Sequence, residues 1–146
     1  MTMQLKTIEI LKEAGWYEGR RIDITEQIKV LQERGFIVFD DAKKFLEEFG
    51  ELTIIDRTEE DDGVFENIHE TVLEEVISDY NSGVFKLKYV EEKTLPIGYI
   101  HNGEMYLWIS ESGKFYIDRG FIAESVEEMW NHIIGDGGRI ICWKNM

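Results

Sequence analysis

The sequence predicts a single α+β domain in which a central antiparallel β-meander packs against several short helices. Strand-like runs broken by turn residues fill residues 96–118, a pattern typical of a three-stranded meander. Apolar residues at helical spacing recur in short segments before and after it. The chain of 146 residues is long enough to bury a core, and it has no internal repeat or Pro-rich linker. We therefore interpret residues 1–146 as one domain.

The first hairpin of the meander is predicted around Asn102 and Gly103. This dipeptide readily adopts φ > 0 at both central positions of a type I′ turn. It joins residues 97–101, the first expected strand, to residues 104–110, which should fold straight back.

The middle strand has two different faces, because side chains alternate along a strand. Residues 111–114 then form a second loop in which Gly113 can take the left-handed conformation, and residues 115–118 return as the third strand. We expect both faces of the middle strand to be partly covered, with helices on the apolar one. The two sets of side chains are Met105, Leu107 and Ile109 on one face and Tyr106, Trp108 and Ser110 on the other.

Three short amphipathic helices are predicted before the meander, because Ser, Thr or Asp suits a helix start and Gly a helix end. They are residues 3–14 followed by Gly15, a helix capped by Thr25 that stops at Gly35, and a helix capped by Asp40 that Gly50 closes. Their apolar stripes are Leu5, Ile8, Leu11 and Ala14 in the first, Ile28 and Leu31 in the second, and Ala42, Phe45, Leu46 and Phe49 in the third.

The stretch between the third helix and the meander is predicted in shorter pieces. We expect residues 52–55 to form a strand at an edge of the meander, residues 59–63 an exposed acidic loop, and residues 64–68 a short strand. Residues 84–90 fit either an alternating strand or two helical turns, and the sequence leaves this open. Before them, one helical face is formed by Val72, Leu73, Val76, Ile77 and Tyr80.

A last helix is predicted after the meander. Ser125 should cap it, and it should end before Gly135. The tail, residues 139–146, is too apolar to be a solvated tail, so we expect it to dock. The inward-facing side chains of the helix are Val126, Met129, Trp130 and Ile133.

The chain is strongly acidic, with 30 Asp and Glu against 16 Lys and Arg and a formal net charge of −14. This argues against direct binding of nucleic acid, which requires a basic footprint. Nine of the fourteen net negative charges lie between Asp56 and Tyr80, where Arg57 is the single Lys or Arg. The charge either serves solubility or attracts a basic partner. The acids are Asp56, Glu59, Glu60, Asp61, Asp62, Glu66, Glu70, Glu74, Glu75 and Asp79.

The sequence predicts a soluble, cytoplasmic protein that does not bind a membrane. Cys142 is the single cysteine, which fits a reducing compartment. No run approaches the roughly 18 apolar residues of a membrane span. Residues 1–11 alternate polar and apolar side chains and do not form a signal-peptide core.

The sequence contains few residue combinations that could support catalysis, and we expect neither an enzyme nor a metal site. His69, His101 and His132 lie far apart in the sequence, and none has a second His or Cys at i+3 or i+4. Cys142, His132 and Asp136 could be drawn as a nucleophile, base and orienting group, but a buried thiol among surface polar groups is the simpler interpretation.

Calcium, phosphate and small-ligand sites also lack support. If Gly63 took the sixth position of an EF-hand loop, His69 would stand at the twelfth, where a bidentate Glu is needed. The glycines near residue 135 follow a helix and do not open one, so they form no phosphate cradle. Aromatic side chains at Tyr106, Trp108 and Tyr116 could line a ligand groove, although such residues on strands more often belong to a core.

A series of short motifs in the first third of the chain comprises Ala14-Gly15-Trp16, Gly19-Arg20, Ile22-Asp23, Gly35, Ala42, Phe45-Leu46, Phe49-Gly50 and Leu52. Two more follow, Leu95-Pro96-Ile97-Gly98 and Glu111-Ser112-Gly113-Lys114-Phe115-Tyr116. In order and spacing, these motifs resemble those of the third family of SUKH immunity proteins over nearly the whole chain. One departure is Glu51, where the family often has a second glycine.

The resemblance implies a small, SUKH-like α+β domain from a bacterium. Such proteins bind the toxic domain of a polymorphic toxin, often a nuclease or deaminase, and so protect the producing cell and its kin. The resemblance implies no catalytic residues and no cofactor. An acidic protein suits this role physically, because long-range attraction speeds its association with a basic nuclease and the complex can occlude the phosphate-binding site.

We expect the partner surface in the acidic segment, residues 56–79, together with exposed aromatic residues of the sheet. The alternative is that this segment is only a solvated surface. The candidate partner-binding residues are Asp56, Glu59, Glu60, Asp61, Asp62, Glu66, Glu70, Tyr106 and Trp108.

We assign eight motif residues to maintenance of the fold. Within this set we expect the Trp16 indole to be buried and the Arg20 guanidinium to pair with an acid such as Asp23. The eight residues are Gly15, Trp16, Gly19, Arg20, Phe49, Gly50, Pro96 and Gly98.

Two rival classes of function remain open. One is a regulatory or scaffold module of the same fold, as in the fungal cell-wall synthesis regulators grouped with SUKH, whose partner is not a toxin. The other is a small enzyme that uses His101 or His132 with a nearby carboxylate. The sequence leaves the toxin and the oligomeric state undetermined.

Overall fold

The computed structural model describes residues 2–78, 87 and 89–135. Several sequence predictions lie outside these residues: those for Asp79, Tyr80, most of residues 84–90, Asp136, Gly137, Gly138, Cys142 and the tail at residues 139–146.

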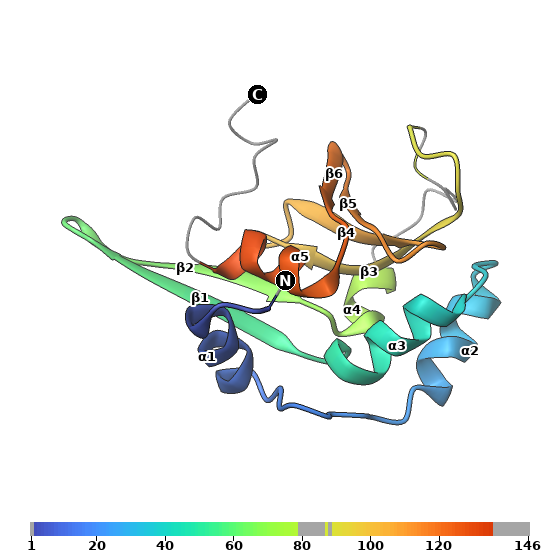
Figure 1. Cartoon of the computed structure of the whole chain (residues 1–146), viewed down its shortest axis with the longest axis horizontal. Helices are drawn as coiled ribbons and strands as arrows, with labels where there is room; N and C mark the ends of the chain where they lie inside the picture. The colour runs from blue at the N-terminus through green and yellow to red at the C-terminus, as the bar shows by residue number, and fades with distance from the viewer. Residues whose placement is uncertain (1, 79–86, 88, 136–146) are drawn as a thin grey trace.

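The predicted α+β fold is confirmed, with one antiparallel sheet and helices packed against it (Figure 1). The predicted meander is its centre, and the sheet extends further at both edges. Among the described residues, six strands follow one another in chain order across the sheet. They are β1 Thr53–Glu60, β2 Gly63–Glu70, β3 Thr94–Ile100, β4 Met105–Ser110, β5 Phe115–Ile117 and β6 Gly120–Ala123.

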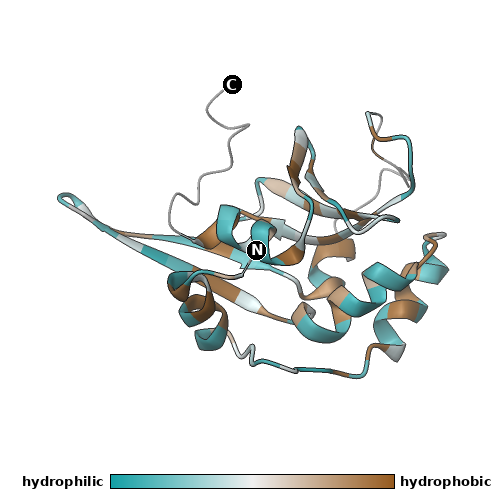
Figure 2. Ribbon diagram, in the orientation of Figure 1, coloured by the Kyte–Doolittle hydropathy of each residue, from teal (hydrophilic) through white to brown (hydrophobic). Residues whose placement is uncertain are grey.

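Helices build the core on one face of this sheet. Each of the five described helices contributes side chains to one large buried cluster, among them Leu11, Leu31, Phe45, Leu73 and Trp130. Figure 2 shows hydrophobic residues gathered where helices and sheet meet. The helices are α1 Leu5–Glu13, α2 Thr25–Glu33, α3 Asp40–Phe49, α4 Leu73–Ser78 and α5 Val126–Ile134.

The strand limits predicted for the first half of the sheet are wrong. β1 and β2 run much longer than residues 52–55 and 64–68, and the expected acidic loop is only a two-residue turn at Asp61 and Asp62. The pairing tolerates the acidic residues because none faces another acid: Asp56 lies opposite Asn67, and Glu59 opposite Val64. Local composition gave the wrong boundary because cross-strand pairs decide where a strand ends.

The central hairpin has the predicted turn, and its strands end one residue pair earlier. Asn102 and Gly103 have φ of 60° and 86°, and the Glu104 N–H donates to the His101 carbonyl at 3.2 Å. The ladder stops at Ile100 and Met105 because His101 also has a positive φ, 52°. The strand β6, which the sequence did not reveal, returns beside β5 after this meander.

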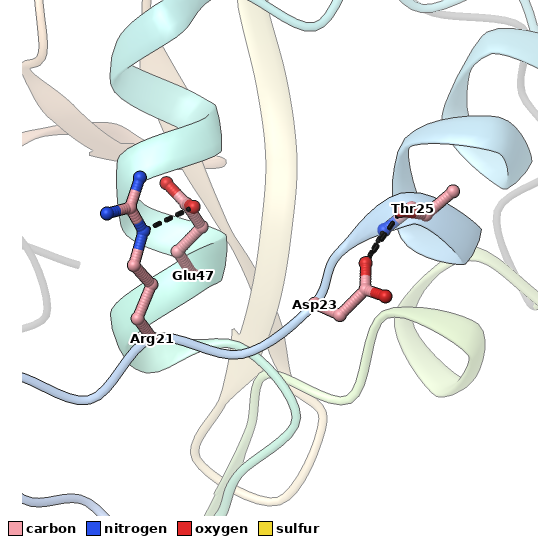
Figure 3. Close-up of polar contacts among 4 residues, drawn as sticks. All are labelled: Arg21, Asp23, Thr25 and Glu47. Carbon is pink, nitrogen blue, oxygen red and sulfur yellow. Dashed lines mark hydrogen bonds and ion pairs between the residues drawn. The ribbon is translucent and has the colours of Figure 1, made fainter.

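The helix starts are partly as predicted. Ser125 caps α5, accepting a bond from the Glu128 N–H at 3.2 Å. Thr25 does not cap α2, because it is the first helical residue, and Asp23 Oδ1 accepts from its N–H at 3.0 Å instead (Figure 3). Asp40 is likewise the first residue of α3 and makes no capping bond.

The buried face of α1 is the predicted one except at Leu5. Leu11 is buried, and Ile8 and Ala14 are partly buried and pack against the core, whereas Leu5 is 72% exposed. Thr7 is buried as well: its Oγ1 donates to Asn131 Oδ1 of α5 at 2.8 Å, and Asn131 Oδ1 also accepts from the Gln4 N–H. Hydrophobic spacing alone could not show these buried polar bonds.

The connection between α1 and α2, which we call the strap, is hydrogen-bonded to the C-terminal end of α3. Arg21 Nε lies 3.0 Å from Glu47 Oε2 (Figure 3), and the Ile22 N–H donates to the Glu47 carbonyl at 2.9 Å. The expected Arg20–Asp23 pair is wrong. Arg20 Nη1 donates to the Glu48 carbonyl at 2.7 Å, because the strap brings it to the C-terminal carbonyls of α3.

Glu51 occupies a backbone position that favours glycine, with φ of 61°. Its carboxylate accepts bonds from Gln27 Nε2 of α2 and from the Leu73 N–H at the start of α4. The side chain therefore joins two helices across the turn, which offsets the conformational cost of the left-handed backbone.

We expect Glu51→Ala to be less stable than Glu51→Gly by about 1 kcal/mol, because both lose the carboxylate bonds and only Ala keeps the left-handed penalty. Urea unfolding midpoints at constant slope measure the difference. The matched control is Glu9, exposed in the middle of α1, where Ala should instead be the more stable by about 1 kcal/mol. The same order at both positions would contradict the assigned strain.

Candidate functional site

The β1–β2 hairpin forms an arm, defined here as residues 56–67, that extends away from the helices (Figure 1). β1 and β2 pair in unbroken register from Thr53 with Glu70 to Glu60 with Gly63. β2 pairs with β3 only at Glu70 and Tyr99. The outer half of the arm therefore stands beyond the rest of the sheet.

One face of the arm, together with the Ile55–Ile68 pair at its base, combines apolar and charged side chains. Side chains of directly opposed residues share a face, so Ile55 lies beside Ile68, Arg57 beside Glu66 and Glu59 beside Val64. Val64 is 60% exposed and Ile68 36%. Arg57 Nε pairs with Glu66 Oε2 at 2.6 Å between them. We call these six residues the outer face.

This face continues onto the central strands. Because Glu70 opposes Tyr99 and Tyr99 opposes Tyr106, both tyrosines lie on the same side of the sheet as Val64 and Ile68. Both tyrosine side chains are partly buried. On the other side of the arm, opposite Thr58, Phe65 is also exposed.

The expected exposure of Trp108 is wrong, since only 2% of this residue is exposed. Leu87 and Val90 pack against it in a small second cluster, and its Nε1 donates to Asp118 Oδ1 at 2.9 Å. These two residues, which precede β3 in the chain, cover Trp108. Tyr106 borders the same cluster.

The candidate acids do not form one continuous surface. Glu59, Asp61 and Asp62 are exposed towards the end of the arm, and Glu66 is exposed in its ion pair. Glu70 is buried and accepts a bond from Thr53 Oγ1. Glu60 ends β1.

Asp56 is set apart from the other acids on β1. It is partly buried, and its Oδ1 has no hydrogen-bond partner. Burial raises the pKa of Asp56, although the nearby Lys6 of α1 opposes the shift.

Two hydrogen bonds from one turn residue, Asn102, hold the base of the arm. The Asn102 N–H donates to the Ile68 carbonyl at 2.9 Å, and the Ile68 N–H donates back to Asn102 Oδ1 at 2.9 Å. The asparagine side chain thus extends the β2–β3 ladder beyond the last strand pair. The Asn-Gly turn serves both as a hairpin turn and as an anchor for the arm.

A pair of histidines lies beside this anchor, which sequence spacing did not reveal. The His69 and His101 rings are 5.1 Å apart at 82°, and His69 Nδ1 accepts from the His101 N–H at 3.1 Å. Burial holds the pKa of His69 at about 3, with the neighbouring His101 as a second cause. Burial also lowers the pKa of His101, whereas the negative charge of Glu104 acts to raise it. The two rings meet because β2 and β3 are neighbouring strands: His69 lies in β2 and His101 directly follows β3.

The motif residues assigned to the fold converge on the C-terminal end of α3 and on the end of β2. Trp16 is buried, stacks on Phe49 with ring centroids 5.9 Å apart and donates from Nε1 to Glu48 Oε2 at 3.1 Å. A Cβ on Gly98 would stand 2.6 Å from the Glu70 carbonyl. Their role in folding stays a prediction that these contacts support. The remaining members are Gly15 and Gly19, with φ of 110° and 81°, Arg20, Gly50, and Pro96 beside a register shift in β3.

The described residues offer little for catalysis. They contain no group of three or more His, Cys, Asp or Glu that could hold a metal ion. His101 packs on His69, whereas His132 lies on α5 and contacts Glu128 at 3.3 Å. A cleft of about 290 Å³ lies between α3 and the β4–β5 loop, and one of about 790 Å³ between α2 and α4. No helix in the described part of the chain is long and apolar enough to cross a membrane.

Comparison with protein-family models gives a match to the SUKH-3 immunity protein family over residues 3–136. No match was found among curated proteins or among solved structures.

We expect Asn102→Gly to speed amide exchange at Ile68 several-fold, because glycine keeps the turn but removes the acceptor of the Ile68 N–H. Asn102→Asp is the matched control, since it keeps an acceptor oxygen at the same place. Residue-resolved hydrogen exchange measures the effect. Equal exchange at Ile68 in the two variants would refute the anchoring role.

We expect the free energy of unfolding to fall by roughly 1 kcal/mol per pH unit between about pH 6.5 and about pH 5 on account of His69. In this range the unfolded chain protonates His69 and the folded protein, with its pKa near 3, does not, so acid favours unfolding. Urea unfolding at each pH measures the slope.

The control for this pH dependence is removal of the buried ring itself. His69→Gln should flatten the slope, because the amide side chain does not titrate. An unaltered slope in His69→Gln would contradict the assignment to this buried ring.

Proposed function

Because the chain belongs to the SUKH-3 immunity protein family, we propose that it protects the cytoplasm of its producing cell by binding and neutralising a cognate toxin domain. It acts by occupying a surface of the toxin and not by catalysis. The regulatory module of the same fold remains the second candidate, and it differs in having a partner that is not a toxin.

The observation that carries the choice of partner is the net charge of −14, with its excess in the acidic segment that includes the arm. We propose a basic toxin domain, such as a nuclease or deaminase, because such enzymes bind phosphate groups with cationic surfaces. Attraction between opposite charges raises the association rate and places the acidic protein over the cationic site.

The partner surface that we propose is a revised form of the one expected from sequence. Glu59, Asp61, Asp62 and Glu66 remain its acidic part, because these side chains are exposed. Tyr106 remains at its border. Trp108, Asp56 and Glu70 are removed from the expected contacts, since each is buried or partly buried.

The test uses the C-terminal domain of the toxin encoded beside the chain's gene. We expect co-expression with the chain to restore growth of an indicator bacterium, and the purified pair to bind with an association rate that falls as salt rises from about 50 to about 300 mM. Toxicity that persists despite expression of the chain, together with no binding of the purified pair, would reject the proposal.

Matched charge variants test the electrostatic part. The triple variant Glu59→Gln, Asp61→Asn and Asp62→Asn should slow association by about tenfold. A control triple, Glu9→Gln, Glu26→Gln and Glu33→Gln, removes the same charge from exposed positions on α1 and α2 and should change the rate by less than about twofold. Equal slowing by the two triples would assign the effect to net charge and not to the arm.

A further inference from the structure

The outer face exposes apolar side chains that the fold does not use. Val64 is well exposed, Ile68 less so, and the partly buried Ile55 lies beside Ile68. A two-stranded ribbon that stands beyond its sheet has no core behind it to cover such residues. Exposed apolar groups beside charged ones are typical of protein contact surfaces.

The apolar side chains form two groups, Val64 towards the turn and Ile55 with Ile68 at the base, and the Arg57–Glu66 ion pair of 2.6 Å lies between them. We call the three apolar residues the apolar centre. Its acidic rim is formed by Glu59 directly beside Val64 and by Asp61 and Asp62 in the turn. The outer face and the turn therefore present net negative charge. A protein that covers them must bring cationic groups for the rim and apolar groups for the centre.

A second copy of the chain fits this face poorly. Two copies in contact here would place identical acidic rims together, each on a molecule with a net charge of −14. Like charges across an interface are costly, whereas a basic partner meets the same rim favourably.

The arm is also anchored well enough to present a defined surface. Asn102 holds Ile68 by two backbone-directed bonds, and the strand pair of Glu70 and Tyr99 continues the face onto the sheet. Tyr99 and Tyr106, with partly exposed aromatic rings, extend the apolar centre towards the body of the protein.

We propose that the outer face is the docking surface for the toxin domain, with Ile55, Val64 and Ile68 as its apolar centre and the acids of the arm as its rim. This inference rests on the proposed function and specifies its contact. The rim attracts the basic surface over long distance, and the apolar centre holds the complex once it has formed.

The test separates these two contributions. In Val64→Thr with Ile68→Thr, both residues keep β-branching, so the strands remain favourable while the apolar contact is weakened. We expect the affinity for the toxin domain encoded beside the gene to fall at least about tenfold, mainly through faster dissociation, because the charges are unchanged.

The matched control is Leu5→Thr with Ile37→Thr, which alters residues exposed by 72% and 58% outside the arm. This double variant should bind as the wild type does. Thermal unfolding and exchange of the Asn102 amide, which donates to the carbonyl of residue 68, verify that both variants remain folded. Wild-type affinity in the arm variant would overturn the proposal while leaving the proposed function intact; absence of binding by the wild type would instead reject the proposed function itself.

One further measurement addresses self-association. Sedimentation of the chain alone should show the same oligomeric state for the wild type and for the arm variant. A wild-type dimer that dissociates in Val64→Thr with Ile68→Thr would overturn the proposal, because it would assign the outer face to a second copy.

Discussion

The fold depends on a junction at Thr71, where the end of α3, the start of β1 and the end of β2 meet. Thr71 Oγ1 donates to the Phe49 carbonyl at 2.5 Å and accepts from the Leu52 N–H at 3.0 Å. The Thr71 N–H donates to the Leu52 carbonyl, and its carbonyl accepts from the Glu51 N–H, each at 2.9 Å. The threonine is buried. An apolar replacement would therefore leave the Phe49 carbonyl and the Leu52 N–H without the hydrogen bonds of its hydroxyl, in a place that water does not reach. This small set of bonds joins helix packing to strand pairing.

Two motifs that are distant in the sequence serve the same junction. The strap after α1 reaches Glu48 through Trp16 and Arg20, and the close approach of Gly98 lets β3 pass the Glu70 carbonyl. Their residue types follow from geometry, because an indole N–H and a guanidinium reach the terminal turn of a helix, and only glycine leaves room for a carbonyl at 2.6 Å from the Cβ position. The motifs therefore carry information about the fold more directly than about a partner.

The proposed docking surface lies on the part of the chain that contributes least to the core. The arm contributes little to the core, yet it is held at its base by Asn102 and by the buried histidine pair. A rigid base with an acidic rim and an apolar centre suits the recognition of a protein surface, because charge acts over about 10 Å and apolar contact only at touching distance. The binding chemistry of a neutralising partner needs no nucleophile, base or metal.

The sequence by itself determined the features governed by short-range periodicity and turn chemistry: the α+β class, the helical stripe of α3, the Asn102-Gly103 turn and the Ser125 cap. Its charge also indicated which segment could meet a basic partner. Only the tertiary structure decided the length of β1 and β2, the burial of Trp108, the exposure of Leu5 and the contact between His69 and His101. These depend on cross-strand register and on contacts between residues far apart in the chain. A hydrophobic pattern shows that a side chain can be buried, but the neighbouring elements determine whether it is covered, as Leu87 and Val90 cover Trp108 and nothing among the described strands covers Val64.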